Sequence, residues 1–450
     1  MMTKALVLAA GLGTRMRSGV PKLLQPLGGW PLIRWSVEAC RQAIGEQPYV
    51  VIPAEADELR RAAGSEVQFI VQAEPLGTGH AVSQAAKALN GNSELLIVTN
   101  ADLPLLTAAC LQALVRAQQA NSGPLTVLIA ESDQPRGFGR IERNASGRII
   151  GIVEEAQASP EQRALSELNV GAYCFESEWL WHHLPKIVKS SKGEYYLTDL
   201  VGLASAGGSP VGELKLDDPD EGIGINTLEH LAAAEAAIRW RINRELMERG
   251  VRILDPAVTY VDAGVQVGPD TLLMPGTHLQ GQTVIGSGCE VGPNSILRDS
   301  QVGDRCRIEA SVLEGAVLEE GVEVGPFARL RRGARLGAGV HIGNFGEIKN
   351  STLGPRVKVG HFSYLGDATI GEDVNIGAGT ITCNFDGEHK HPTTIGAGAF
   401  IGSDTMLVAP VTIGRGARTG AGAVVTKDVP AHTLAAGVPA RVIRKLEPGG

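Results

Sequence analysis

The chain has 450 residues, with 41 Lys and Arg against 49 Asp and Glu, and a formal net charge of −8 at pH 7. An acidic chain without a basic stripe is poorly suited to nucleic acid, because phosphate binding needs clustered cations. The length predicts two or three domains, each large enough to bury its own core. Near residue 250 the composition shifts from helix formers to Gly, Val and Ile, which indicates a domain boundary.

Cysteine usage and hydropathy predict a cytoplasmic protein. No run approaches the roughly 20 apolar residues of a membrane span, and the first strand begins almost at Met1 without a leader. The cysteines show no metal-ligand spacing, and we expect all of them to be reduced. They are Cys40, Cys110, Cys174, Cys289, Cys306 and Cys383.

The first predicted element is a buried strand over residues 4–11, followed by a glycine-rich turn and then a helix. Glycines allow backbone N–H groups to approach an anion, and Arg15 and Lys22 can neutralise it. The spacing is neither that of dinucleotide-binding folds nor that of the P-loop. Taken alone, this segment could also be a simple turn.

A second apolar strand, residues 94–102, ends in the carboxylate of Asp102. In open α/β sheets ligands bind at the carboxyl ends of strands, so Asp102 stands where a Mg²⁺ bridging phosphates would be held. Capping of the next helix is the simpler alternative for this side chain. Residues 72–80 form a polar loop suited to reading a base, in which His80 is expected to start a helix.

An amphipathic helix is predicted from Leu228 to Leu246, with Gly250 as its stop. We interpret it as an arm between two domains.

From about Val261 onward, aliphatic residues recur every six positions, which fits neither a helix nor a plain strand. Many of them are followed by Gly, which permits a sharp corner. The pattern predicts a parallel β-helix from about 251 to 438, with roughly ten coils of about 18 residues and a length of about 50 Å. The two phases are Val261, Val267, Leu273, Leu279, Ile285, Val291, Leu297 and Val312, Leu318, Val324, Leu330, Leu336, Ile342, Ile348.

The repeat breaks at residues 384–391, a polar segment with basic and His side chains. Insertions that leave a solenoid face are where function usually lies. His361, on the coil just before this excursion, is the candidate general base, since histidine ordinarily titrates at about pH 6.5. An isolated His is more often structural. Cys383 is interpreted as a packing residue.

Together these motifs resemble known proteins. Residues 8–16, Leu-Ala-Ala-Gly-Leu-Gly-Thr-Arg-Met, with Pro21-Lys22 resemble the sugar nucleotidyltransferases. With the hexapeptide repeat, residues 1–440 resemble the bacterial family that joins a uridylyltransferase to an acetyltransferase. The resemblance implies an α/β nucleotidyltransferase domain (1–228), a linker helix (229–249) and a left-handed β-helix domain (250–450) that assembles as a homotrimer.

The same resemblance implies two reactions. Acetyl-CoA acetylates glucosamine 1-phosphate in the second domain. UMP is then transferred from UTP to N-acetylglucosamine 1-phosphate in the first domain, with Mg²⁺ bound and pyrophosphate released. The product, UDP-N-acetylglucosamine, feeds peptidoglycan and lipopolysaccharide synthesis.

The family's binding residues carry over to positions of this chain. Asp102 and Asn226 are implied to coordinate Mg²⁺. The residues implied to bind UDP-N-acetylglucosamine, with Gly139, Glu154 and Asn169 on the sugar, are Leu8, Ala9, Ala10, Gly11, Arg15, Lys22, Gln72, Gly77, Thr78, Asn100, Ala101, Asp102, Gly139, Glu154, Asn169 and Asn226. Asn100 and Ala101 replace the Tyr-Gly that the family usually has before the metal-binding Asp.

In the second domain the resemblance implies that His361 takes a proton from the 2-amino group. The residues implied to bind the sugar phosphate are Arg331, Lys349, Tyr364, Asn375 and Lys390. Those implied to line the acetyl-CoA groove are Ala378, Asn384, Phe385, Ser403 and Ala421. Phe385 replaces a usual Tyr, and Val438 stands where some relatives have Arg, a role that Arg441, Arg444 or Lys445 could take.

Three alternatives remain open at this point. The first is a single-function nucleotidyltransferase whose β-helix is regulatory or structural. The second is a zinc hydratase fused to a nucleotide domain, with His341, His361 and His389 as candidate ligands. The third is a structural scaffold, which would leave the glycine turn and Asp102 unexplained.

Overall fold

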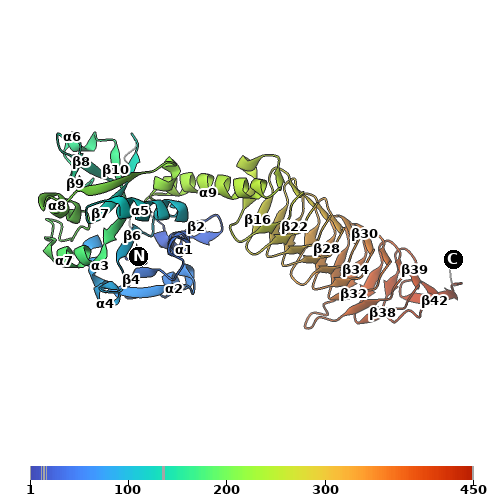
Figure 1. The fold of residues 1–450 in the computed structure, drawn as a ribbon. Helices are drawn as coiled ribbons and strands as arrows, with labels where there is room; N and C mark the ends of the chain where they lie inside the picture. Colours follow the sequence, from blue (N-terminus) through green and yellow to red (C-terminus); the bar gives the residue numbers. More distant parts are fainter. Residues whose placement is uncertain (1, 12, 14–15, 17, 134–136, 448–450) are drawn as a thin grey trace. The chain divides into compact units, whose positions relative to one another are not determined.

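The structure is a computed structural model that describes residues 2–11, 13, 16, 18–133 and 137–447. The chain divides into two compact units, Met1–Ile238 and Arg239–Gly450. Figure 1 shows a sheet with surrounding helices in the first unit and stacked coils of short strands in the second. No helix in the described part of the chain is both long and apolar enough to cross a membrane. The cytoplasmic location stays a prediction.

The first unit contains a mostly parallel sheet in the order β11-β7-β10-β6-β1-β4-β5, in which β10 runs antiparallel to its neighbours. A β8–β9 hairpin pairs with β10. The strands are β1 (Thr3–Leu8), β4 (Tyr49–Pro53), β5 (Gln68–Gln72), β6 (Leu95–Asn100), β7 (Leu125–Glu131), β8 (Gly139–Arg143), β9 (Ile149–Val153), β10 (Glu167–Glu176) and β11 (Val211–Lys215).

Both faces of this sheet are buried, which explains why its strands read as continuous apolar runs. On β1, Ala5 and Val7 point into a core shared with α1 and α5, whereas Leu6 points into a second core. The α/β prediction is therefore confirmed. The helices of the unit are α1 (Leu32–Ile44), α2 (Asp57–Ala63), α3 (Thr78–Gln84), α4 (Ala86–Leu89), α5 (Ala108–Ala120), α6 (Pro160–Arg163), α7 (Ser177–His183) and α8 (Asp199–Ala206).

The glycine turn after β1 does not lead straight into an α-helix, contrary to the prediction. The 3-10 turn η2 (Lys22–Leu24) and the short strands β2 (Pro26–Leu27) and β3 (Trp30–Pro31) intervene, and α1 begins only at Leu32. An anion at the turn would therefore be held by loop N–H groups and Lys22 rather than by a helix N-terminus. The expected helix start at His80 is confirmed, because it is the third residue of α3.

Helix α9 spans Leu228–Glu248, and Gly250 beyond it has φ +91, a conformation that favours glycine. The predicted helix and its stop are confirmed. The boundary between the two compact units falls within this helix, and the domain limits expected from the sequence stay predictions.

The second unit is a stack of coils whose strands form three sheets, parallel except that β42 runs antiparallel to β41 (Thr433–Gly437). Almost every strand pairs with the strand three places further along, so each coil adds one strand to each sheet. The sheets have 12, 10 and 9 strands. They run from β12 (Arg252–Ile253) to β42 (Ala440–Lys445), from β13 (Tyr260–Val261) to β40 (Val424–Val425) and from β14 (Gln266–Val267) to β38 (Val411–Ile413). The predicted parallel β-helix and its roughly ten coils are confirmed.

The inward-facing series contains steps of five residues as well as six. After Leu297 the buried positions are Val302, Ile308 and Leu313. Leu313, not Val312, lies opposite Leu297 in the ladder. Placing Val312 in the core series was therefore wrong. Coils shortened by one residue shift the register, and the six-residue spacing from Val312 to Leu318 is a coincidence.

Close packing between coils explains most of the glycines that follow core aliphatics, and Gly360, after Val359, is an exception. A Cβ on Gly377 would lie 2.6 Å from both the carbonyl oxygen of Ile401 and the amide nitrogen of Ser403. Those atoms belong to the backbone of the next coil and cannot rotate away. Glycine is required at position 377 because a side chain has no room there, and not because the backbone adopts a left-handed φ.

We expect Gly377→Ala to lower the free energy of unfolding by about 2–3 kcal/mol, because the next coil must shift to admit the methyl group. Gly360→Ala is the matched control, since a Cβ there meets nothing within 4 Å. Urea unfolding of both variants measures the difference. Equal losses would show that coil spacing does not select glycine at these positions.

Candidate functional site

A cavity of about 580 Å³ in the first unit lies at the carboxyl ends of parallel strands. Leu8, Gln72 and Asn100 are the last residues of β1, β5 and β6, and all line it. This is the edge where α/β sheets bind ligands. The other lining residues are Ala9, Ala10, Gly11, Gly13, Lys22, Leu23, Pro75, Gly77, Thr78, Ala81, Asp102, Glu194, Tyr196 and Asn226.

Most residues predicted for the nucleotide therefore converge on one cavity. Ala101 does not line it and is 1% exposed, with its N–H donating to the Leu8 carbonyl at 3.0 Å. Asn100 lines the cavity and lies 3.4 Å from the Gly171 carbonyl through its Nδ2. Arg15 lies outside the described residues.

Two oxygen donors from distant parts of the chain meet one cation in this cavity. Lys22 Nζ lies 2.7 Å from Asp102 Oδ2 and donates to Asn226 Oδ1 at 3.3 Å. The N–H of Ile225 donates to the Asp102 carbonyl at 2.9 Å, which fixes the two segments together.

Glu194 and Tyr196 form part of the cavity wall. Gly79 N–H donates to the Tyr195 carbonyl at 2.8 Å, and a Cβ on Gly77 would lie 2.6 Å from that same oxygen. Gly77, with φ +101, is thus required by both space and conformation. The close approach brings Glu194 and Tyr196 into the cavity.

The residues predicted for the sugar gather beside the cavity without lining it. Asn169 on β10 lies opposite Gly139 on β8, and Glu154 directly follows β9. Thr198 Oγ1 donates to Glu154 Oε1 at 2.9 Å. Thr198 follows Tyr196, a residue of the cavity wall, by two positions. The predicted trio is therefore one cluster next to the nucleotide cavity.

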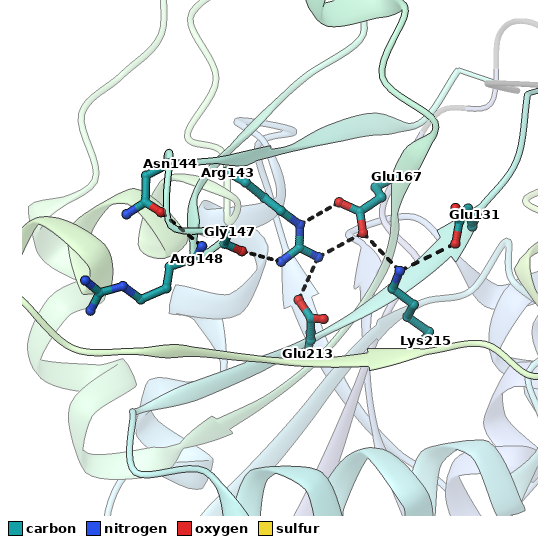
Figure 2. A network of polar contacts seen from close by, with 8 residues as sticks. All are labelled: Glu131, Arg143, Asn144, Gly147, Arg148, Glu167, Glu213 and Lys215. Carbon is teal, nitrogen blue, oxygen red and sulfur yellow. Dashed lines mark hydrogen bonds and ion pairs between the residues drawn. The ribbon is translucent and has the colours of Figure 1, made fainter.

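An ion-pair network anchors the strands that carry this cluster (Figure 2). Arg143 contacts Glu167 at 2.6 Å and Glu213 at 2.7 Å, and Lys215 lies 3.2 Å from Glu167. The Arg143 guanidinium lowers the pKa of the Glu167 carboxyl. Glu167 stands two residues before Asn169 on β10, so the network ties β8, β10 and β11 together at the sugar cluster.

Burial raises the pKa of Glu154, while the hydrogen bond from Thr198 opposes the shift and the nearby Asp199 adds to it. The carboxyl group of Glu154 is therefore harder to ionise than an exposed glutamate.

In the second unit, His361 ends β30 (Lys358–His361) and is exposed at a corner of the coil. Its Nδ1 lies 2.7 Å from Oδ1 of Asn344, the residue at the equivalent position one coil earlier. An amide oxygen can only accept, so the proton belongs on Nδ1 and the Nε2 lone pair is left available. Sequence reasoning missed Asn344, although the ladder spacing of 17 residues could have indicated it.

Three of the predicted acetyl-CoA residues continue the column that His361 begins. The Ala378 carbonyl accepts from Asp404 N–H at 2.7 Å, and the Ser403 carbonyl accepts from Gly422 N–H at 2.8 Å. These bonds stack Ala378, Ser403 and Ala421 on successive coils at the corner that follows the first sheet of the β-helix. A groove along this column would end at His361.

The predicted phosphate-binding cations meet at the opposite edge of the neighbouring sheet. Arg331 N–H donates to the Ile348 carbonyl at 2.8 Å, which places Arg331 beside Lys349 on successive coils. Lys390 lies close enough to lower the pKa of Lys349, and the charge of Arg331 adds to the effect. Two carboxylates share this cluster, since Arg331 donates to Glu347 Oε1 at 3.0 Å and the charge of Asp367 acts to raise the pKa of Lys349. Three cations against two carboxylates leave a surplus of positive charge that suits an anion.

Tyr364 and the excursion lie between the column that contains His361 and the cationic cluster. Tyr364 is the first residue of β31 (Tyr364–Gly366), three residues after His361. A Cβ on Gly366 would lie 2.7 Å from the Tyr364 ring and 2.8 Å from Asn384 Nδ2. Glycine at 366 thus lets the tyrosine and Asn384 approach the cationic edge. Asn375 lies in the first sheet, opposite Lys358.

The excursion at residues 384–391 is a compact hairpin. Phe385 and Lys390 form an antiparallel bridge, and His391 Nε2 lies 2.6 Å from Asp386 Oδ2. Asn384 Nδ2 donates to Asp367 Oδ2 at 2.5 Å. Burial acts to raise the pKa of Asp367, but hydrogen bonds from Asn350 and Asn384 outweigh it and the net shift is downward. Asp367 is a second anchor that sequence reasoning missed.

Within one chain these groups line separate hollows. His361 lines one of about 350 Å³ with Phe327, His341 and Phe345, whereas Lys390 lines another of about 580 Å³ with Asp367. No group of three or more His, Cys, Asp or Glu among the described residues forms a metal site, and His341 Nδ1 lies 3.0 Å from Glu323.

Comparison with known proteins bears on both units. Residues 5–188 match the MobA-like NTP transferase domain, and residues 264–299 and 392–427 match the bacterial transferase hexapeptide repeats. The bifunctional protein GlmU of Trichlorobacter lovleyi is 47% identical over 438 residues, which cover 96% of this chain and 95% of that protein. The chain belongs to the GlmU family.

Further GlmU proteins support the assignment. That of Pelobacter propionicus is 44% identical over 436 residues, covering 96% of this chain and 95% of its own. That of Thermotoga petrophila is 43% identical over 443 residues, covering 98% of each chain.

As a GlmU-family member, the chain is a bifunctional enzyme, a uridylyltransferase in its nucleotidyltransferase domain and a glucosamine-1-phosphate acetyltransferase in its hexapeptide domain. The predicted fold is confirmed as a nucleotidyltransferase domain followed by a left-handed β-helix. The single-function, zinc-hydratase and scaffold alternatives do not account for this membership.

We expect Glu154→Gln to stabilise the protein at neutral pH. The raised pKa means that folded Glu154 holds its proton at pH values where the unfolded chain has lost it, so wild-type stability falls as pH rises through this range. The amide carries no charge and its oxygen still accepts from Thr198. Unfolding at a series of pH values should show a difference that vanishes well below the ordinary Glu pKa and grows as pH rises. A difference independent of pH would contradict burial of the charge as the cause.

Proposed function

We propose that the two units of this GlmU-family chain carry out successive reactions at the two sites described above. Acetyl-CoA first acetylates glucosamine 1-phosphate on the β-helix. UMP then passes from UTP to the acetylated sugar phosphate in the first unit, with release of pyrophosphate. The observation that carries the proposal is the presence of two chemically distinct constellations, one around Asp102 and the other around His361, in separate compact units.

The donor set in the first unit fits Mg²⁺. Asp102 Oδ2 and Asn226 Oδ1 converge on one ammonium group, so they can converge equally on a metal ion, and oxygen ligands are those Mg²⁺ prefers. When bound, the ion would neutralise charge on the triphosphate.

The chain's own residues position the two reactants. Lys22 and the loop N–H groups hold phosphates, and Gln72, Gly77 and Thr78 hold uracil. Gln72 is oriented for this role because its Nε2 donates to the Gly77 carbonyl at 3.2 Å. The sugar phosphate oxygen bonds to the α-phosphorus as the bond to pyrophosphate breaks. Positioning and charge neutralisation suffice, so no general base is assigned.

In the second unit His361 acts as the general base. Asn344 holds the proton on Nδ1, and Nε2 takes a proton from the 2-amino group as nitrogen attacks the thioester carbonyl. The new C–N bond replaces the C–S bond, and CoA leaves as a thiolate that is protonated by the proton His361 took up. Arg331, Lys349 and Lys390 bind the sugar phosphate, while acetyl-CoA lies along the column of Ala378, Ser403 and Ala421.

We further propose that the β-helix assembles as a homotrimer. Phe327, Phe345 and Phe362 are 60%, 59% and 55% exposed at one corner on successive coils, and the first two rings stack with centroids 5.6 Å apart. Exposed aromatic columns are unusual on a free surface. A neighbouring copy would cover them and join the separate hollows around His361 and Lys390.

We expect Asp102→Ala to lower uridylyl transfer by about 10²–10³-fold, because an oxygen donor to Mg²⁺ is lost. Acetyl transfer should be unchanged, since the two constellations lie in separate units. Asp57→Ala, an acidic residue in the first turn of α2 and outside the cavity, is the control. Pyrophosphate and free thiol are measured separately. Retained pyrophosphate release that depends on Mg²⁺ would contradict the role of Asp102.

His361→Ala should have the reverse effect, lowering acetyl transfer by about 10²–10⁴-fold through loss of the base. His341→Ala is a matched control, because it lines the same hollow but pairs with Glu323. Parallel loss of both activities in His361→Ala would argue against independent sites.

A further inference from the structure

The ammonium group of Lys22 lies between the two side chains proposed to hold Mg²⁺, at 2.7 Å from Asp102 and 3.3 Å from Asn226. A single cation therefore already satisfies both oxygen donors. The inference below rests on the proposed metal site.

The fold holds the Lys22 side chain in this place. Lys22 is the first residue of η2, and its stem packs against the glycine turn. A Cβ on Gly13, where φ is +60, would lie 2.7 Å from Lys22 Cβ and 3.6 Å from its Cδ. The side chain is 12% exposed and that of Asp102 is 24% exposed. This is a positioned, partly buried ion pair rather than a loose surface pair.

The charges of the cavity residues show why Lys22 matters for metal binding. Among the described lining residues, Lys22 carries the positive charge, and Asp102 and Glu194 carry negative charges. Without Lys22, Asp102 Oδ2 and Asn226 Oδ1 would attract a divalent cation in its place. With Lys22 in place, an ammonium and a metal ion would compete for the same two oxygens at distances where like charges repel strongly.

We infer that Lys22 is a placeholder cation, which keeps divalent metal off Asp102 and Asn226 until nucleotide arrives. The triphosphate gives the ammonium a new anionic partner, so Lys22 moves from carboxylate to phosphate and frees both oxygens for the metal. Metal and nucleotide therefore bind with positive coupling, and Lys22 is a positioning residue that sets their order.

The test measures Mn²⁺ binding to the full-length protein without nucleotide, by electron paramagnetic resonance. Lys22→Met should bind Mn²⁺ at least about tenfold more tightly than the wild type. Lys4→Met is the matched control, since Lys4 forms an ion pair with Glu46 at 2.6 Å outside the cavity, and it should bind as the wild type does. Calorimetry should show that Mn²⁺ increases the affinity for UTP more in the wild type than in Lys22→Met.

Equal Mn²⁺ affinities for the wild type and Lys22→Met, or an equal gain in UTP affinity, would overturn the placeholder role while leaving the metal site intact. The double variant Lys22→Met with Asp102→Asn should lose the added Mn²⁺ binding. If it does not, the metal lies elsewhere and the proposed metal site itself is wrong. Lys22→Gln, checked by circular dichroism, replaces Lys22→Met should the latter fail to fold.

Discussion

Parallel strand pairing is the constraint on which both sites depend. When strands run in the same direction, residues that end them share one edge, and residues at equivalent positions share one column. In the first unit this brings the ends of β1, β5 and β6 to one cavity. In the second it aligns Asn344 with His361 and continues the line to Ser403. The register of the strands thus brings residues that are far apart in the chain together in each site.

Much of this arrangement could be predicted, because its signals are local. The apolar strand before Asp102 and the glycine turn before Lys22 are readable without knowing their neighbours. Asn344 and Asp367 were missed because each acts through a partner on another coil. The sugar cluster of Gly139, Glu154 and Asn169 came from family resemblance alone, since cross-strand pairing of β8 with β10 leaves no spacing signal.

The register of the β-helix shows a different limit. A periodic sequence predicts the architecture, but a coil shortened by one residue changes which aliphatic faces inward. Val312 and Leu313 are adjacent and similar in hydrophobicity, so only the ladder position opposite Leu297 distinguishes them. The pairing of charged side chains could also be predicted only in part from the sequence. Arg298 is balanced by Glu314 across the ladder, whereas Lys349 faces other cations, and neither arrangement follows from composition.

The excursion at 384–391 leaves and re-enters the β-helix at nearly the same point. Thr393 N–H donates to the Asp367 carbonyl at 3.1 Å, and β34 (Ile381–Cys383) and β35 (Thr393–Ile395) pair with the coils on both sides as any other strands do. A segment with coincident ends can lengthen, shorten or change its side chains while the stack above and below keeps its spacing. Such a scaffold allows natural variation to alter the chemistry at one corner without having to rebuild the column.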